Sequence, residues 1–166
     1  MKDPKRQAQG LMAKRRGAAF EERLNQTFAY YRSSGAASIT KTPEPMRPLQ
    51  NLGGGTFKAV FASKAEPDYK GILKGGREVM FEAKFTGTDR IEQSRVLPQQ
   101  AEYMDEHARL GARCYVLVGF DGGNVYRVPW ADWQDMKARF GRKYAKEEDL
   151  KPYICPVAPN GVIELI

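Results

Sequence analysis

Side chains that bind soft metals are scarce in this sequence. Its 166 residues include two cysteines, Cys114 and Cys155, and one histidine, His107. Protein zinc sites are built mostly from clusters of cysteine and histidine, so such a site is not expected. Any bound metal would have to be held by oxygen ligands. The two cysteines lie in an apolar run and in a proline-flanked tail, and we predict that both are buried free thiols.

Long hydrophobic runs are also missing. The longest strongly apolar stretch, CYVLVGF at 114–120, is far shorter than the roughly 20 residues needed to span a bilayer. The N-terminal stretch MKDPKRQAQGLMAKRRG is charged and lacks the apolar region of a secretory signal. We therefore expect a cytoplasmic protein without a membrane partner. The length suits a single domain with a buried core.

Positive charge is concentrated at the N-terminus. Residues 1–16 hold six basic residues and one acid, in a chain whose formal net charge is +7. Such a segment is typical of nucleic-acid binders, because each neutralised phosphate releases counterions. A solvated tail that promotes solubility explains the charge equally well. We predict a flexible basic arm at 1–16, with Lys14, Arg15 and Arg16 as candidate DNA contacts, followed by a single domain at 17–166.

Periodicity and turn residues predict a mixed order of elements. The stretch 42–57 contains three prolines and three glycines, so we expect it to project as an arm or extended loop. The remaining order predicts an α/β or α+β sheet with helices on its faces. Helices are expected at 17–35, 98–111 and 130–141, and strands at 36–41, 58–64, 112–120, 124–130 and 161–166.

The segment EPDYKGILKGGREVMFEAKF, at 66–85, contains the strongest chemical signal. A hairpin turn is predicted at its glycine pair, 75–76. Side chains alternate along the strand that follows, so Glu82 and Lys84 share one face. An antiparallel hairpin with this turn brings Asp68 alongside Glu82. Two carboxylates held this close repel each other, and a divalent cation with oxygen ligands, such as Mg²⁺, resolves the conflict.

These parts suit phosphodiester hydrolysis. A divalent cation neutralises charge on a phosphate under attack, and a nearby lysine orients the attacking water. The alternative is an exposed Glu82–Lys84 pair with Asp68 capping a turn, which is the common explanation of an isolated Glu-x-Lys tripeptide. The added aspartate, glycine turn and amphipathic strand favour the metal site.

The same residues resemble a known family. Pro67-Asp68 and Glu82-Ala83-Lys84 match the PD-(D/E)xK nuclease signature, whose core is a restriction-endonuclease-like fold. The wider sequence is similar to the RecU-type Holliday junction resolvases, also called penicillin-binding protein-related factor A, from about residue 15 to about residue 130. Four stretches carry this similarity: RGAAFEERLNQTFAYY (16–31), ASITKTPEP (37–45), DYKGILKGGREVMFEAKFT (68–86) and LPQQAEYM (97–104).

The resemblance implies a homodimer that nicks four-way DNA junctions with Mg²⁺ or Mn²⁺ as cofactor. The implied fold is a mixed central sheet flanked by helices, with 42–57 as a stalk that enters the junction centre. The implied catalytic and metal-binding groups are Asp68, Glu82, the Ala83 carbonyl oxygen, Lys84 and Gln100, with Glu21 as a further acid and Glu22 as its competitor. The implied DNA contacts in and beside the stalk are Lys41, Arg47 and Lys58.

Two departures from the family pattern are visible. Glu66 stands where the family usually has threonine, which makes it an additional candidate metal ligand. The stalk region is shorter and contains glycine at 53–55, so junction selectivity stays open. Two alternatives remain: a nuclease acting on flaps, ends or linear duplex DNA, and a non-catalytic basic DNA-binding protein. Because Glu82 and Lys84 are both intact, we favour an active enzyme.

Overall fold

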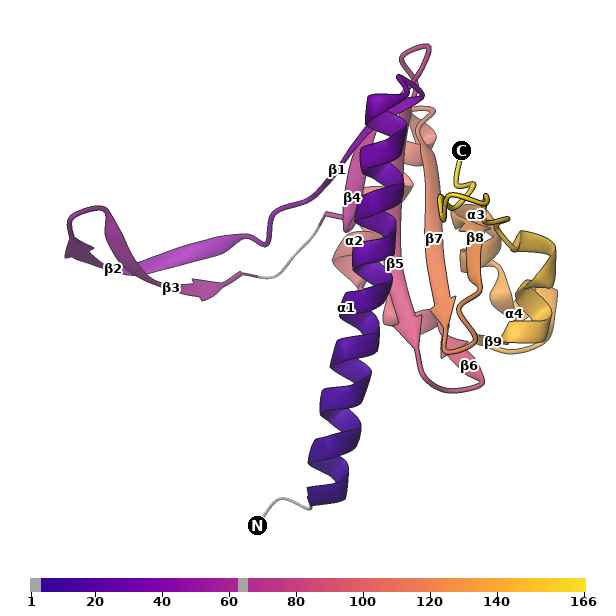
Figure 1. Cartoon of the computed structure of the whole chain (residues 1–166), viewed down its shortest axis with the longest axis horizontal. Coiled ribbons are helices and arrows are strands. Elements are labelled where there is room, and N and C mark those ends of the chain that lie inside the picture. Colours follow the sequence, from indigo (N-terminus) through magenta and orange to yellow (C-terminus); the bar gives the residue numbers. More distant parts are fainter. Residues whose placement is uncertain (1–3, 63–65) are drawn as a thin grey trace.

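A five-stranded mixed sheet forms the centre of the molecule (Figure 1). The computed structural model describes residues 4–62 and 66–166. In spatial order the sheet contains β1 (Ala37–Lys41), β4 (Tyr69–Leu73), β5 (Glu78–Thr86), β7 (Arg113–Phe120) and β8 (Val125–Pro129). β5 and β7 run parallel, whereas the other neighbouring strands are antiparallel. The predicted mixed sheet and its glycine hairpin are therefore confirmed.

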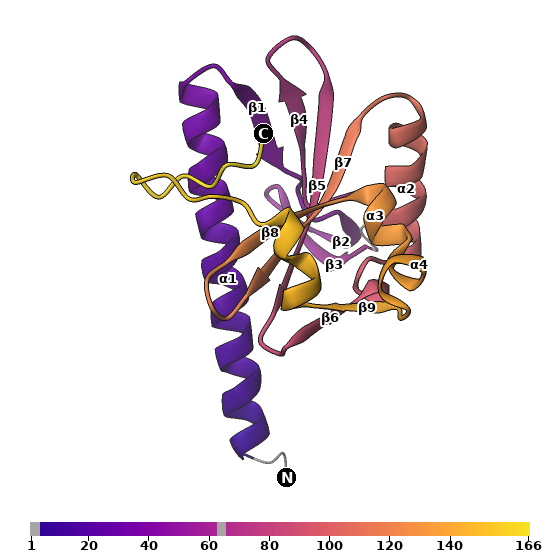
Figure 2. The same ribbon diagram turned by 90° about the vertical axis from the view of Figure 1, so that its right-hand side faces the viewer.

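Helices cover both faces of this sheet (Figure 2). α1 (Pro4–Ser33) packs on one face, and α2 (Pro98–Arg109) packs on the other and connects the two parallel strands. The helix predicted at 130–141 is divided at Asp135 into α3 (Trp130–Gln134) and α4 (Met136–Phe140). The remaining elements are β2 (Met46–Gly53), β3 (Thr56–Phe61), β6 (Arg90–Glu92), β9 (Tyr144–Lys146), and the 3₁₀ turns η1 (Gln93–Arg95) and η2 (Glu147–Tyr153).

The first helix begins well before the predicted boundary at residue 16. Residues 4–16 continue the same helix as 17–33, and its N-terminal half extends beyond the sheet (Figure 1). The segment is rich in alanine, lysine, arginine and glutamine, which favour helix, and Pro4 suits a first turn. The boundary predicted between a basic arm and a folded domain therefore falls inside a helix. Residues 1–3 lie outside the described residues.

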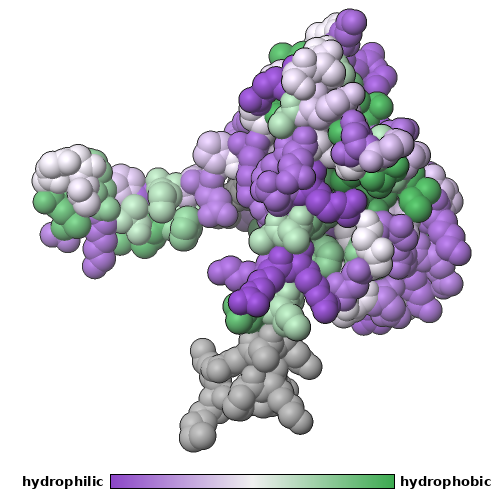
Figure 3. Space-filling view, in the orientation of Figure 1, coloured by the Kyte–Doolittle hydropathy of each residue, from purple (hydrophilic) through white to green (hydrophobic). Residues whose placement is uncertain are grey.

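The proline- and glycine-rich stretch projects from the body, as predicted (Figure 3), and it forms a two-stranded hairpin (Figure 1). β2 and β3 pair antiparallel and together form the projecting hairpin, residues 46–61. The register shifts between Pro48 and Gln50, and such an irregularity accommodates a proline that cannot donate. Gly53, Gly54 and Gly55 all have positive φ (85°, 58° and 78°), which favours glycine at the tip. The strand predicted at 58–64 belongs to this hairpin, and its last two predicted residues lie outside the described residues.

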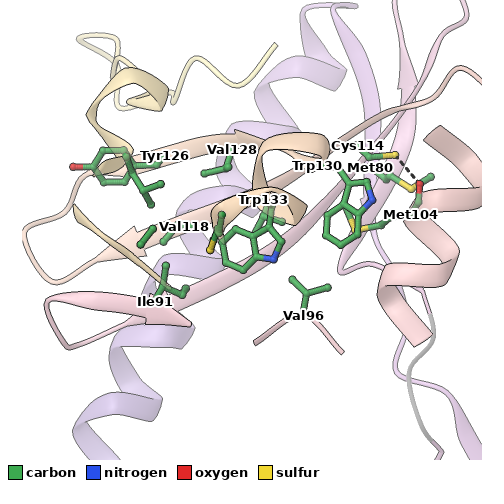
Figure 4. Packing of buried hydrophobic residues seen from close by; sticks show 14 of the residues in the cluster. Met80, Ile91, Val96, Met104, Cys114, Val118, Tyr126, Val128, Trp130 and Trp133 are labelled. Atoms are coloured by element: carbon green, nitrogen blue, oxygen red, sulfur yellow. Dashed lines mark hydrogen bonds between the residues drawn. The ribbon is translucent and has the colours of Figure 1, made fainter. Parts of the chain in front are cut away.

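Two hydrophobic clusters fill the space between the sheet and its helices. On the α1 face, Leu24 and Phe28 pack against Phe81 of β5. On the opposite face, Met80 and Trp133 belong to the second cluster (Figure 4). Both faces of β5 are thus buried, and the face that carries Glu82 is covered instead of exposed. Both cysteines are buried and free, as predicted.

The prediction of a strand at 161–166 is wrong. This segment makes one isolated bridge, between Val157 and Ile163, and its other hydrogen bonds go to the preceding loop, to Arg127 of β8 and to α1. The Tyr31 hydroxyl donates to the Ile163 carbonyl at 2.5 Å and accepts the Leu165 N–H at 2.8 Å. A side chain of the helix therefore satisfies backbone groups that a neighbouring strand would otherwise bond. Within the described ranges, no helix has both the length and the apolar character needed to cross a membrane.

Gly71 lies in the middle of β4 and leaves no room for a side chain. An added Cβ would lie 2.0 Å from the Ser38 carbonyl oxygen and 2.7 Å from the Ile39 Cα, both backbone atoms of β1. We expect Gly71→Ala to lower the free energy of unfolding by about 2–3 kcal/mol, because β1 and β4 must separate. Urea denaturation measures this change. Gly122→Ala, whose added Cβ meets nothing within 4 Å, should stay within about 0.5 kcal/mol of the wild type; equal effects of the two substitutions would contradict the close approach of the strands.

Candidate active site

A cleft of about 810 Å³ opens at the carboxyl-terminal end of β5. α1 contributes one wall, which includes Phe20 and Glu21. Asp68, Ala83 and Lys84 line the cleft where β4 and β5 meet. A further wall is formed by residues 85–92 with Arg95. The cleft therefore gathers groups from α1, the central hairpin and the segment that follows it.

The hairpin brings Asp68 and Glu82 together as predicted. Tyr69 pairs with Phe81, so the two acids face each other one position further along. The Asp68 N–H donates to Glu82 Oε2 at 3.2 Å, and the Ala83 N–H donates to Asp68 Oδ2 at 3.0 Å. Each carboxylate thus accepts a backbone hydrogen bond from the segment that carries the other.

Glu82 is fully buried and is held by two further side chains. Lys84 Nζ lies 2.5 Å from Glu82 Oε1, and Gln100 Nε2 donates to the same oxygen at 2.9 Å. The Leu97 N–H donates to Gln100 Oε1 at 3.1 Å, which fixes the orientation of the amide. Burial, together with repulsion from Asp68, raises the pKa of Glu82 to about 7, although Lys84 acts in the opposite direction.

The donor groups at this point fit a hard divalent cation. Mg²⁺ is usually bound by one or two carboxylates, keeps several waters and accepts oxygen ligands only. Asp68 and Ala83 line one end of the cleft, and the buried Glu82 carboxylate lies directly behind them, bonded to the Asp68 N–H, so two carboxylates and the Ala83 carbonyl are the candidate oxygen donors. In the part of the chain that the structure describes, no three His, Cys, Asp or Glu side chains gather closely enough to hold a metal. Among the described residues, Asp68 and Glu82 are therefore not joined by a third acid.

Glu21 reaches the cleft but has a partner of its own. Its Oε2 lies 2.5 Å from Lys41 Nζ, so the predicted catalytic acid and a predicted DNA contact form an ion pair. Its competitor Glu22 accepts a hydrogen bond from Gln26 at 3.1 Å on the exposed helix surface. Of the two acids, Glu21 lines the cleft and Glu22 does not. Glu66 pairs with Lys70 at 2.7 Å and does not line the cleft.

The other predicted DNA contacts lie in two separate places. Lys14 and Arg15 are exposed on the part of α1 that extends beyond the sheet, whereas Arg16 pairs with Asp121 at 2.5 Å. Arg47 and Lys58 are exposed on the projecting hairpin. Arg47 faces Val60 across the strand pair, and Lys58 lies two residues from Val60, so both cations occupy the same face of the hairpin.

Sequence comparison decides the family. The sequence model of the RecU family, described as recombination protein U, matches residues 15–164. The chain belongs to the RecU family. Proteins named Holliday junction resolvase RecU from Bacillus pumilus and Pediococcus pentosaceus are each 30% identical to it, over 81% and 78% of this chain and 69% of each relative. A Streptococcus pneumoniae protein of the same name is 32% identical, over 70% of this chain and 62% of the relative. This RecU-family chain thus spans from 62% to 69% of the length of these relatives.

The fold comparison agrees with this placement. Archaeoglobus fulgidus Hjc, described as a Holliday junction resolvase from an archaeal hyperthermophile, matches with a TM-score of 0.51 and 14% sequence identity. The match covers 88% of this RecU-family chain and 95% of Hjc. At this identity the likeness establishes the fold, and the restriction-endonuclease-like core is confirmed.

Sequence reasoning missed the wall formed by residues 85–92 and Arg95. Asp89, Arg90, Glu92 and Arg95 all line the cleft beside the predicted site. The available signal was their position directly after the Glu82-Ala83-Lys84 triplet. Tyr144, which contacts Arg90, is far away in the sequence and gave no such signal.

The raised pKa of Glu82 predicts a pH-dependent stability of the metal-free RecU-family protein. Glu82 holds its proton more tightly in the folded state than in the unfolded state, so protonation stabilises the fold. This contribution to the free energy of unfolding is fully present below pH 4.5 and is lost as pH rises through the folded-state pKa of about 7. Between pH 5 and pH 8 we expect a loss of about 2–3 kcal/mol, at roughly 1.4 kcal/mol per pKa unit. The measurement is urea denaturation in EDTA, comparing wild type with Glu82→Gln, which cannot titrate. A difference between the two proteins that is the same at both pH values would contradict this prediction.

Proposed function

We propose that this chain is a metal-dependent DNA endonuclease that resolves four-way junctions by paired nicks, with Mg²⁺ or Mn²⁺ as cofactor. The observation that carries the proposal is that Asp68 faces the buried Glu82, while Asp68 and Lys84 line a cleft of a restriction-endonuclease-like fold. Membership of the RecU family and the resolvase names of its relatives support the junction as substrate.

The roles of the residues follow from their contacts. When bound by Asp68, Glu82 and the Ala83 carbonyl, the cation supplies positive charge that stabilises the phosphate under attack. Lys84 is 16% exposed at the cleft, and its ammonium orients the attacking water by donating a hydrogen bond. Gln100 acts as a positioning residue, because its fixed amide holds the Glu82 carboxylate in place.

The projecting hairpin supports a dimer. Met46 faces Phe61, and Phe57 lies on the same side, so one face of the hairpin is apolar, with these three side chains 58%, 69% and 52% exposed. A two-stranded hairpin is marginally stable alone in water, so an apolar face of this kind favours a covering partner. We propose that a second copy of the chain covers it, which leaves the face of Arg47 and Lys58 for DNA. Two active sites then serve the two strands of one junction.

The dimer has its own test. We expect Phe61→Ser to shift the protein toward monomer in sedimentation velocity, because a large apolar side chain is removed from the interface. Val60→Ser, on the other face of the same strand, serves as the matched control and should leave the association unchanged. Equal sedimentation of the two variants and the wild type would contradict this role of the apolar face.

The function is tested by cleavage mapped to the nucleotide. A synthetic four-way junction, a flap and a linear duplex of matched sequence are incubated with the protein in Mg²⁺ and in Mn²⁺. Symmetric nicks in junction strands of like polarity are expected, with little cutting of the duplex. Preferred cutting of the flap or duplex would indicate a nuclease with another substrate. Tight junction binding without cleavage in either metal would indicate a non-catalytic DNA-binding protein.

A further inference from the structure

Arg90 lies on the wall of the active-site cleft and stacks on a tyrosine. Its guanidinium carbon is 4.7 Å from the centre of the Tyr144 ring, and that of Arg142 is 4.9 Å from the same centre. Both distances are within the range of about 6 Å over which cation–π attraction operates. One aromatic ring therefore contacts two guanidinium groups, and we call these three residues the arginine–tyrosine stack.

The stack is anchored to the body of the protein through Arg142. Arg142 Nη1 donates to the Phe140 carbonyl at 2.8 Å, and its Nη2 bonds to the Asp149 carboxylate. Tyr144 lies in β9, which pairs antiparallel with β6, the strand that contains Arg90. Backbone pairing and ring contacts thus hold Arg90 at a defined place beside the cleft.

The positive charge of Arg90 is still available to a ligand. Its side chain is 51% exposed, and its Nε lies 3.0 Å from Glu92 Oε1. Among the described residues, no group accepts a hydrogen bond from either terminal nitrogen of Arg90. A guanidinium presents two parallel N–H donors that match the oxygens of a phosphate, and stacking reduces the entropy lost when it binds.

The position of Arg90 indicates which ligand it meets. Arg90 and Arg95 line the same cleft as Asp68 and Lys84, and Arg95 is itself oriented toward the Phe85 carbonyl at 3.4 Å. A DNA strand whose scissile phosphate lies at Asp68 and Lys84 places its neighbouring phosphates along the cleft walls. Cations on those walls neutralise phosphates that the catalytic residues do not reach.

We propose that Arg90, held in place by Tyr144 and Arg142, binds a backbone phosphate adjacent to the scissile phosphate. This proposal rests on the proposed function, because it requires DNA in the cleft. It assigns the β6–β9 ribbon to substrate binding, with the arginine as the contacting residue and the tyrosine as a positioning residue.

The test measures binding of a fluorescent four-way junction across a range of salt concentrations, in the 166-residue chain carrying Asp68→Asn to prevent cleavage. Arg90→Gln is expected to weaken binding about tenfold and to reduce the slope of log affinity against log salt by about one, the effect of one lost phosphate contact. Tyr144→Leu is expected to weaken binding about threefold with the slope unchanged, because the charge remains but is not held. Tyr144→Phe keeps the ring and should bind as tightly as the parent protein.

Arg77→Gln is the matched control. Arg77 is an exposed arginine in the turn before β5, whereas the cleft opens at the other end of that strand, so its loss should change neither affinity nor slope. An Arg90→Gln protein with the parent affinity and slope overturns the proposal, and identical binding by Tyr144→Leu and Tyr144→Phe overturns the role of the stack.

Failure of this proposal can be distinguished from failure of the proposed function. A protein with Asp68 intact that binds DNA through Arg90 but leaves junctions uncut contradicts the proposed function and supports the phosphate contact.

Discussion

Asp68→Asn is expected to lower the rate of junction cleavage in Mg²⁺ by at least about 10³-fold, which corresponds to about 4 kcal/mol of transition-state stabilisation. The substitution removes one of the two charges that favour a cation in the cleft. Asparagine retains an oxygen that can accept the Ala83 N–H, the hydrogen bond that Asp68 accepts at 3.0 Å. The fold should therefore survive, and the loss should fall on catalysis.

Single-turnover cleavage of a labelled junction measures this effect, with binding measured separately in Ca²⁺. Junction affinity should change little, because the residues proposed to contact DNA are untouched. Asp135→Asn, at an exposed aspartate between α3 and α4, is the matched control and should cut at the wild-type rate. Wild-type cleavage by Asp68→Asn would exclude Asp68 from the active site.

Lys84→Met is expected to lower the cleavage rate by about 10²- to 10³-fold, the usual cost of losing one preorganised donor at a reacting phosphate. Its Nζ lies 2.5 Å from the fully buried Glu82. Methionine is similar in length but has no charge. The variant therefore loses the hydrogen-bond donor to the attacking water and the ammonium charge that offsets the Glu82 carboxylate. A higher Mg²⁺ concentration should not restore the rate, because a cation held by Asp68 and Glu82 does not replace the lost donor.

Lys70→Met is the corresponding control for Lys84→Met. Lys70 also forms a lysine–glutamate pair, with Glu66 at 2.7 Å, but both side chains are partly exposed and lie off the cleft. Its cleavage rate should stay within about twofold of the wild type, since exposed pairs contribute little. If Mg²⁺ titration restored full activity to Lys84→Met, the lysine would act only through metal affinity and not on the attacking water.

The central hairpin and the closeness of Asp68 to Glu82 were predictable because their signals are local. Glycine at 75–76 fixes the turn, and the alternation of the following strand fixes which side chains share the face of Glu82. The parallel pairing of β5 with β7 follows from the intervening α2. The burial of Glu82 was not predictable in this way, because it depends on α2 packing over that face.

The remaining errors arose where contacts formed in the folded chain, most of them between distant residues, override composition. Tyr31 bonds to Ile163 and Leu165, more than 130 positions away, and this replaces the expected terminal strand. The projecting hairpin forms despite its prolines because an irregular register tolerates Pro48. Arg90 and Tyr144 meet only once β6 pairs with β9, and neither residue carries a motif. The resemblance supplied Glu21 and Gln100, which spacing alone did not single out.

The projecting hairpin can change in sequence during evolution more freely than the rest of the chain. None of its described residues belongs to either hydrophobic cluster, so its sequence is not constrained by packing of the nuclease body. Its amides should also exchange with solvent hydrogen through local opening that leaves the sheet intact whenever no partner covers it. Substitutions and length changes in the hairpin are therefore limited by the partner or DNA that the hairpin contacts, and not by the stability of the fold. Substrate preference can therefore drift while the chemistry at Asp68 and Glu82 stays the same.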